Sequence, residues 1–348
     1  MSVHPPAAYI NGNLETHHLK NGCSIVLMDL PAAKEYLVEL VYGGIGSAMN
    51  LDVGKAGLAH VLEHMKCRPA YVGDSSRARG MMRGMNRWVE LGGSYQNAST
   101  DSERMCFYSI VPKSDIDTAV AIYVEQHTGD ALRQDEVAAE LPAVLNEMDR
   151  GKLAPIRKIQ ALLQRLVSLH SPQGSHTTIG FRKAVESVTA ETLNAFNTNF
   201  MTTDRATMVI AGNFSDAAFK DTVRKNLKAQ WGSMEKSECK CSRYEFAEME
   251  CAAPSQNVST MIMDEPGFNF LMTAVPMPLA TTLESVHYEM AAVAMGHHLG
   301  DVEVQARRSS AANPTLVLAM NCEGDINKAH ESIRVALNTR VPNIEAFN

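Results

Sequence analysis

Two histidines and a glutamate are the residues best suited to chemistry: His60, Glu63 and His64, in the segment His-Val-Leu-Glu-His. Apolar residues with helical spacing run along the same segment and predict a helix over residues 57–65: Leu58, Val61, Leu62 and Met65. On such a helix His60 and His64 project from one side, and Glu63 lies beside them. The apolar side can then anchor the helix while the polar side faces a site.

Two neutral imidazoles suit Zn²⁺, and a catalytic zinc ion usually has three protein ligands and an open position for water. Glu63 precedes the second histidine directly, so it is poorly oriented to bind the same ion but well placed to take a proton from zinc-bound water. The sequence therefore predicts zinc held by His60, His64 and a third ligand, with Glu63 as general base. The alternative interpretation is a polar cluster of surface histidines on a solvated helix.

The elements that must position this helix are predicted by periodicity and turn signals. Strands are expected at 24–29, 36–43, 95–100, 105–111, 206–211, 260–264, 270–275 and 315–322. Helices are expected from Ser114 onward and at 134–150, 156–169, 190–200, 215–230, 283–298 and 325–338. We expect the strands at 24–29 and 36–43 to pair, Ser114 and Ser215 to cap helices, and Pro142 to kink or restart its helix.

Length and composition set limits on the fold and on its partners. A chain of 348 residues is long enough for two domains, and we expect one unit at 1–235, a linker at 236–255 and a second unit at 256–348. The 32 Lys and Arg residues against 39 Asp and Glu, without a basic stripe, argue against nucleic acid. Apolar runs are too short for a membrane span. Residues 1–20 lack a signal-peptide pattern, and the seven cysteines are scattered, so we expect a cytoplasmic protein with reduced thiols.

Several segments around the histidine motif resemble a known family, the inverted-motif zinc peptidases that include pitrilysin, insulin-degrading enzyme and the mitochondrial processing peptidase. The resemblance covers about residues 21–230. Its landmarks besides the motif are Asn21-Gly22, residues 54–59, Gly92-Gly93, residues 97–100, Thr178-Ile179-Gly180 and residues 209–213. The resemblance implies an α+β fold, a mostly antiparallel sheet with helices packed on it, imperfectly duplicated. It also implies that 1–235 is the zinc-binding catalytic half and that 256–348 is a shortened, metal-free second half.

The resemblance also implies a third zinc ligand, a glutamate on another helix beyond the motif. By count Glu140 fits, but Glu140 and Glu147 together reproduce the family's Glu-x6-Glu pair, of which the second member is the ligand. The stretch between His64 and Gly92 is longer than is usual in the family, which would inflate the count, so we favour Glu147 as the ligand. Glu140 is then the neighbouring or alternative ligand.

Further expectations follow from the same resemblance. Asn97, Ala98 and Ser99 would lie on an edge strand to which a peptide substrate adds through main-chain hydrogen bonds. The chain would be a zinc metalloendopeptidase with one Zn²⁺, which hydrolyses oligopeptides or unfolded segments. The alternative is a non-catalytic partner subunit of a two-chain peptidase. The expected protein partner is a second copy of the chain or a complementary peptidase-like subunit.

Overall fold

The structure is a computed structural model, and it describes residues 14–47, 55–67, 95–129, 131–154, 157, 177–239, 259–265, 268–276, 302–308, 314–321, 327, 331 and 335. The chain divides into two compact units, Met1–Val144 with Thr178–Arg243, and Leu145–Thr177 with Tyr244–Asn348. The division falls inside one continuous helix, α4 (Gln134–Leu153). The predicted halves at 1–235 and 256–348, with their linker at 236–255, stay a prediction.

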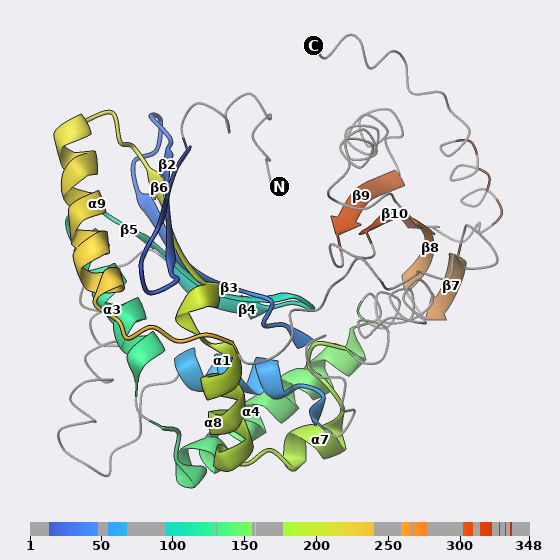
Figure 1. Cartoon of the computed structure of the whole chain (residues 1–348). Helices are drawn as coiled ribbons and strands as arrows, with labels where there is room; N and C mark the ends of the chain where they lie inside the picture. The colour runs from blue at the N-terminus through green and yellow to red at the C-terminus, as the bar shows by residue number, and fades with distance from the viewer. Residues whose placement is uncertain are drawn as a thin grey trace. The chain divides into compact units, whose positions relative to one another are not determined.

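The first unit contains a six-stranded sheet whose strands lie in the order β1-β2-β6-β3-β5-β4 (Figure 1). The strands are β1 (Leu14–His18), β2 (Ser24–Asp29), β3 (Tyr36–Gly43), β4 (Tyr95–Thr100), β5 (Arg104–Val111) and β6 (Ala206–Gly212). All neighbouring pairs are antiparallel except β2 and β6. Side chains in β3 alternate between buried and half-buried positions, as expected for a strand with one face on the core.

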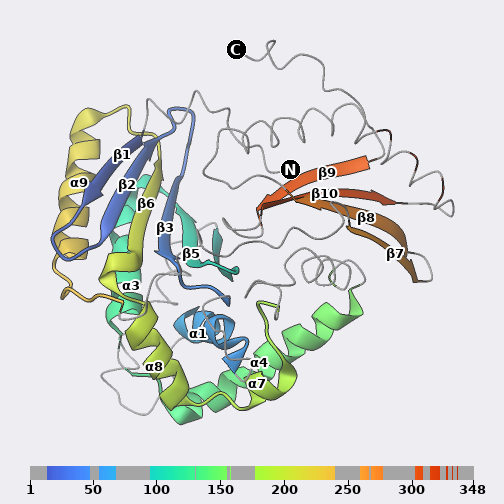
Figure 2. The same cartoon turned by 45° about the vertical axis from the view of Figure 1, so that its right-hand side comes forward.

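Helices pack against both this sheet and one another. Besides α4 they are α1 (Leu58–Cys67), α3 (Ile116–Thr128), α7 (Arg182–Glu186), α8 (Ala190–Phe200) and α9 (Ala217–Gly232). Helices α3 and α9 lie side by side, and α3 packs on β3 and β5 (Figures 1 and 2). Helix α1 packs against the edge strand β4 and against α8, so the histidine motif lies beside the end of the sheet.

The second unit contains a four-stranded antiparallel sheet in the order β7-β8-β10-β9. Its strands are β7 (Ser259–Glu265), β8 (Phe268–Pro276), β9 (Val302–Arg308) and β10 (Pro314–Asn321). Together the two sheets and the helices confirm the predicted α+β fold with mostly antiparallel strands. In the part of the chain that the structure describes, no helix combines the length and hydropathy that crossing a bilayer requires.

One predicted strand pairing was wrong, and two strands were missed. Strands β2 and β3 do not pair, because β6 lies between them, parallel to β2 and antiparallel to β3. Strand β6 buries five of its seven residues, which suits an interior position. The sequence analysis also missed β1, whose residues LETHH lack the apolar alternation of a half-buried strand, and β9, although its residues VEVQARR have that alternation.

Helix boundaries were predicted more closely than helix caps. Asp216 caps α9 by accepting hydrogen bonds from the backbone of Ala218 and Phe219, in place of Ser215. Ser114 does not cap α3, because its hydroxyl donates to Asp115. The expected helices at 156–169 and 283–298 lie outside the described residues apart from residue 157, which is helical, as are residues 327, 331 and 335.

Pro142 does not end or restart α4, which continues from Gln134 to Leu153. Val137, Val144 and Met148 are buried at helical spacing along it. Burial of this face outweighs the hydrogen bond that proline removes. Glu140 and Glu147 therefore lie two turns apart on one helix.

Candidate metal centre

Helix α1 carries the histidine motif on a side opposite its apolar anchor. Its buried apolar residues are Leu58, Val61, Leu62 and Met65. The helix begins directly after Gly57, whose carbonyl accepts a hydrogen bond from the Val61 amide at 3.0 Å. Burial of the apolar side fixes the helix and presents His60, Glu63 and His64 together.

The start of α1 is fixed by close packing of two loops. Gly57 and Gly180 both have positive φ, at 94° and 79°. A Cβ on Gly180 would lie 2.2 Å from the Ala56 carbonyl oxygen, and one on Gly57 would lie 2.6 Å from the Ile179 carbonyl oxygen. Only glycine fits either position. The turn at 178–180 therefore docks on the first residues of the motif helix, which explains why both segments stand out in the sequence.

The other end of α1 is anchored to α3. The Lys66 amino group donates to the Gln126 carbonyl at 2.8 Å, and the Gln126 side-chain amide donates to the Lys66 carbonyl at 3.2 Å. Lys66 is buried, and this burial lowers its pKa to about 8. With both ends held, the helix is a rigid mount for the motif.

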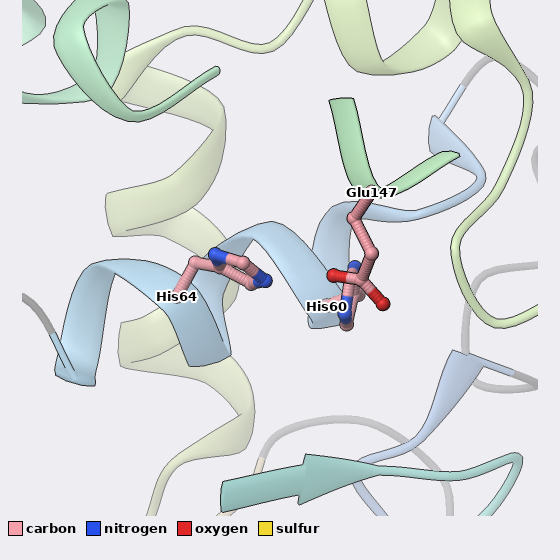
Figure 3. Close-up of side chains that lie close together, drawn as sticks. All are labelled: His60, His64 and Glu147. Atoms are coloured by element: carbon pink, nitrogen blue, oxygen red, sulfur yellow. The ribbon is translucent and has the colours of Figure 1, made fainter. Parts of the chain in front are cut away.

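His60, His64 and Glu147 come together in the structure. Each offers one possible ligand atom, and the three atoms lie within 4.8 Å of one another. The centroids of the two imidazole rings are also 4.8 Å apart, and the ring planes meet at an angle of 74°. Figure 3 shows the histidines projecting from α1 toward Glu147, which comes from α4. The Glu147 carboxylate also lies 4.0 Å from the Arg157 guanidinium.

Glu140 meets the same histidine pair in a different way. Its Oε1 lies 3.1 Å from Nδ1 of His64, and both side chains are largely buried. A carboxylate on one imidazole nitrogen fixes the ring so that the other nitrogen, Nε2, can bind a metal. The structure thus brings both glutamates that the sequence singled out to the histidines, Glu147 within the donor cluster and Glu140 behind His64.

Glu63 is buried beside the histidines and accepts a hydrogen bond from the Thr100 hydroxyl at 2.6 Å. Cys67 lies one turn further along α1. Burial, followed by the charges of Glu63 and Glu140, raises the pKa of the Cys67 thiol to about 12. Cys67 is therefore protonated at neutral pH and is not a thiolate ligand in this state.

Asn97, Ala98 and Ser99 lie on β4, the last strand in the described order of the sheet. The Ala98 amide donates to the Asn97 side-chain oxygen at 2.9 Å, and Ser99 Oγ lies 3.1 Å from Cys106 Sγ. The backbone pairing shows where the Ala98 N–H points. The Asp101 N–H donates to the Arg104 carbonyl, and in an antiparallel pair the N–H groups of successive residues point alternately toward and away from the partner strand. Ala98 lies three residues before Asp101, so its N–H points away from β5. The outer edge of β4 thus carries a main-chain donor that a further strand could use.

Sequence analysis missed the Thr100 contact with Glu63 and the Lys66 contacts with Gln126. Thr100 stands two residues after Ala98 in a strand, so period-two alternation puts both on the face that packs against α1. That alternation was readable from the sequence. The Lys66 anchor was not, because it joins segments 60 residues apart.

The donor set fits zinc. Two imidazoles and one carboxylate form a ligand set found in catalytic zinc sites, with bonds of about 2.0–2.2 Å. Donors around one such ion lie roughly 3.3 Å apart, so the present spacing of at most 4.8 Å needs adjustments of about 1–2 Å, within the reach of side-chain rotation.

The family description "Insulinase (Peptidase family M16)" matches residues 40–172, which include the motif helix and both glutamates. An "uncharacterized zinc protease" of Rickettsia bellii is 25% identical over 201 residues, 58% of this chain and 46% of that protein. The β subunit of the mitochondrial processing peptidase of Saccharomyces cerevisiae is 26% identical over 223 residues, 64% of this chain and 45% of that protein. The matched part of the chain thus spans about half the length of these curated relatives.

Solved structures agree on the fold. A protease from Helicobacter pylori has a TM-score of 0.73 at 18% identity, over 93% of this chain and 78% of that one. Pitrilysin has a TM-score of 0.67 at 16% identity, over 93% of this chain and 36% of that one. The family match over residues 40–172 and the zinc protease relatives support the insulinase family of peptidases, family M16, for this chain, and the solved structures share its fold.

Proposed function

We propose that this chain is the metal-binding part of a zinc metalloendopeptidase that hydrolyses peptide bonds in oligopeptides or unfolded segments. The observation that carries the proposal is the convergence of His60, His64 and Glu147 within 4.8 Å beside the buried carboxylate of Glu63. The family's zinc proteases support the same class of reaction. We expect one Zn²⁺ per chain.

His60, His64 and Glu147 would hold the ion, and Glu140 would orient His64 through its Nδ1. Bound Zn²⁺ would supply Lewis-acid chemistry, polarising the scissile carbonyl and acidifying water. Glu63 would take the proton from the attacking water and return it to the leaving amine. Its low exposure limits competition from bulk water for that proton.

The substrate would bind as an extra strand on β4. Main-chain donors and acceptors on this edge recognise any extended peptide with little dependence on its side chains. The Ala98 N–H, at present bonded to the Asn97 side chain, would instead donate to a substrate carbonyl. Ser99, bonded to Cys106, would help to fix this segment of the strand on β5.

The test is cleavage of a quenched fluorescent peptide library by purified protein, with bound zinc quantified in parallel. Glu63→Gln is expected to keep about one zinc ion per chain and to lose cleavage by about 1000-fold or more, because the amide cannot accept the proton. Glu191→Gln, an exposed glutamate in the first turn of α8, serves as the matched control and should cleave like the wild type. Undiminished cleavage by Glu63→Gln would contradict the proposed role of Glu63.

The alternative is a non-catalytic partner subunit of a two-chain peptidase. It is considered because the matched region covers only about half of each curated relative, so further sequence takes part in those proteins. Zinc binding without cleavage by the wild type, with cleavage restored by a co-purified complementary chain or by a second copy, would favour a shared site. Absence of zinc binding would overturn the metal site itself.

A further inference from the structure

A threonine on the edge strand contacts the proposed general base. The Thr100 hydroxyl donates to Oε2 of Glu63 at 2.6 Å. This is the length of a hydrogen bond from a hydroxyl to an ionised carboxylate, which is shorter and stronger than one between neutral groups. A hydroxyl has a single proton, so the Thr100 hydroxyl donates to Oε2 alone and restrains the orientation of the carboxylate.

Thr100 is itself held in a rigid part of the sheet. It is the last residue of β4 and lies opposite Met105 in β5. The turn that follows is fixed on both sides, because Asp101 bonds to the Arg104 amide and its carbonyl accepts from the Ser47 amide at 2.9 Å. A branched side chain in a strand has restricted rotation about χ1. The hydroxyl is therefore a fixed point and not a mobile surface group.

We propose that Thr100 is a positioning residue: its hydroxyl orients the Glu63 carboxylate for proton transfer, and so joins the substrate-binding strand to the base. The proposal rests on the proposed function for its catalytic consequence. Thr100 lies two residues beyond Ala98, so a substrate strand added to β4 would pack directly on the segment that holds the base. Misorientation of the base should then lower kcat and leave substrate binding in place.

Two variants separate the Thr100 hydroxyl from the rest of its side chain, and a third serves as the control. Thr100→Val keeps the shape and removes the donor, while Thr100→Ser keeps the donor. The matched control is Thr222→Val on α9, an exposed threonine whose hydroxyl donates to the Ala218 carbonyl. We expect Thr100→Val to lower kcat by about 10–100-fold with KM and zinc content within about twofold, Thr100→Ser to recover most of kcat, and Thr222→Val to match the wild type.

Two kinetic results would overturn the proposal. One is an unchanged kcat in Thr100→Val. The other is an equal loss in Thr100→Val and Thr100→Ser, which would assign the effect to lost packing and not to the lost donor. Loss of zinc from Thr100→Val would likewise show a structural role.

A measurement without turnover keeps this inference separate from the proposed function. Crystal structures of the wild type, Thr100→Val and Thr100→Ser, each loaded with zinc, report the Glu63 orientation directly. We expect the carboxylate to bond residue 100 in the wild type and Thr100→Ser, and to rotate or split into several conformers in Thr100→Val. An unmoved carboxylate in Thr100→Val overturns the positioning role, whereas a wild type that binds zinc and cleaves nothing counts against the peptidase proposal alone.

Discussion

The two outer strands of the six-stranded sheet, β1 and β4, hold their neighbouring carboxylates with different partners. At the β1 edge, Glu15 is bound by two cations from α9, Arg224 at 3.0 Å and Lys220 at 3.1 Å, and also by the His17 imidazole of its own strand. At the β4 edge, Glu63 accepts from a threonine hydroxyl, and Glu140 meets an imidazole nitrogen. At the β1 edge, opposite charges hold the strand on α9, and near the β4 edge, carboxylates are oriented around His60 and His64.

This difference indicates that the carboxylate at the β1 edge contributes to stability, whereas the carboxylates near the β4 edge are suited to metal binding and proton transfer. A carboxylate neutralised by Lys and Arg gains modest stability and has little capacity left for a metal or a proton. A carboxylate oriented by a hydroxyl or an imidazole keeps its negative charge for a bound cation or a reaction. Substitutions at β1 should therefore change stability, and substitutions around β4 should change metal binding and turnover.

The largest expected effect that separates the two edges is on zinc affinity. Glu147→Gln should weaken zinc binding by about 1000-fold, because one of three protein ligands is lost. Glu140→Gln should weaken it by about 10–100-fold, because only the orientation of His64 suffers. Glu15→Gln, the same change at the β1 edge, should leave it unchanged. Competition with a chelating dye measures all three, and a larger loss in Glu140→Gln would exchange the roles of the two glutamates.

Much of this centre could be predicted from the sequence, and the reason is local. His60, Glu63 and His64 share one helix, so helical spacing alone determines their common side. The glutamates were harder to assign, since count favoured Glu140 and pattern favoured Glu147. Both glutamates lie near the histidines because α4 continues through Pro142. Proline disfavours a helix interior, so this continuity depends on burial of the apolar side of α4 and could not be predicted from the local sequence.

The sheet shows the corresponding limit. Strand boundaries such as Tyr95–Thr100 followed from local propensity and turn signals, but strand order depends on contacts between distant segments. The insertion of β6 between β2 and β3 joins residues about 180 apart in sequence, and no local pattern reports it. Strand β1, whose sequence LETHH has little strand propensity, could not be predicted either, because it is a strand through its pairing with β2.

The next largest expected effect is on kcat/KM, when proline replaces a residue in either outer strand. Ala98→Pro removes a main-chain N–H that points away from the sheet, so β4 should still pair with β5 but lose a donor to the substrate. Thr16→Pro is the matched change in β1. The Leu19 N–H donates to the Cys23 carbonyl, so by the same alternation the Thr16 N–H, three residues earlier, points away from β2. We expect Ala98→Pro to lower kcat/KM for extended peptides by about 100-fold and Thr16→Pro to have no effect on it.

Circular dichroism would verify that both proline variants are folded before their kinetics are compared. Equal losses in the two variants would indicate a general effect on the sheet, and the distinction between its edges would then be wrong. Equal activity in both would show that substrates do not add to β4.

The smallest effect is on stability at the β1 edge. Partial burial raises the pKa of Glu15, but hydrogen bonds from Arg224, Lys220 and His17 outweigh it and lower the pKa to about 2 from the usual 4.5. Glu15 is 26% exposed, so solvent screening reduces the free energy that this shift implies. Glu15→Gln should lower the free energy of unfolding by about 1 kcal/mol at pH 7, measured by urea denaturation, and leave peptide cleavage unchanged.

The pH dependence of that difference identifies its origin. The folded pKa is below the unfolded one, so the stability from the ionised Glu15 is fully present above pH 4.5 and is lost as the pH falls toward 2. The wild type and Glu15→Gln should therefore converge in stability over this range, and their difference at pH 7 should shrink in high salt. A difference that persists at pH 2 would come from packing of β1 on α9, and charge pairing would then not be what stabilises this edge.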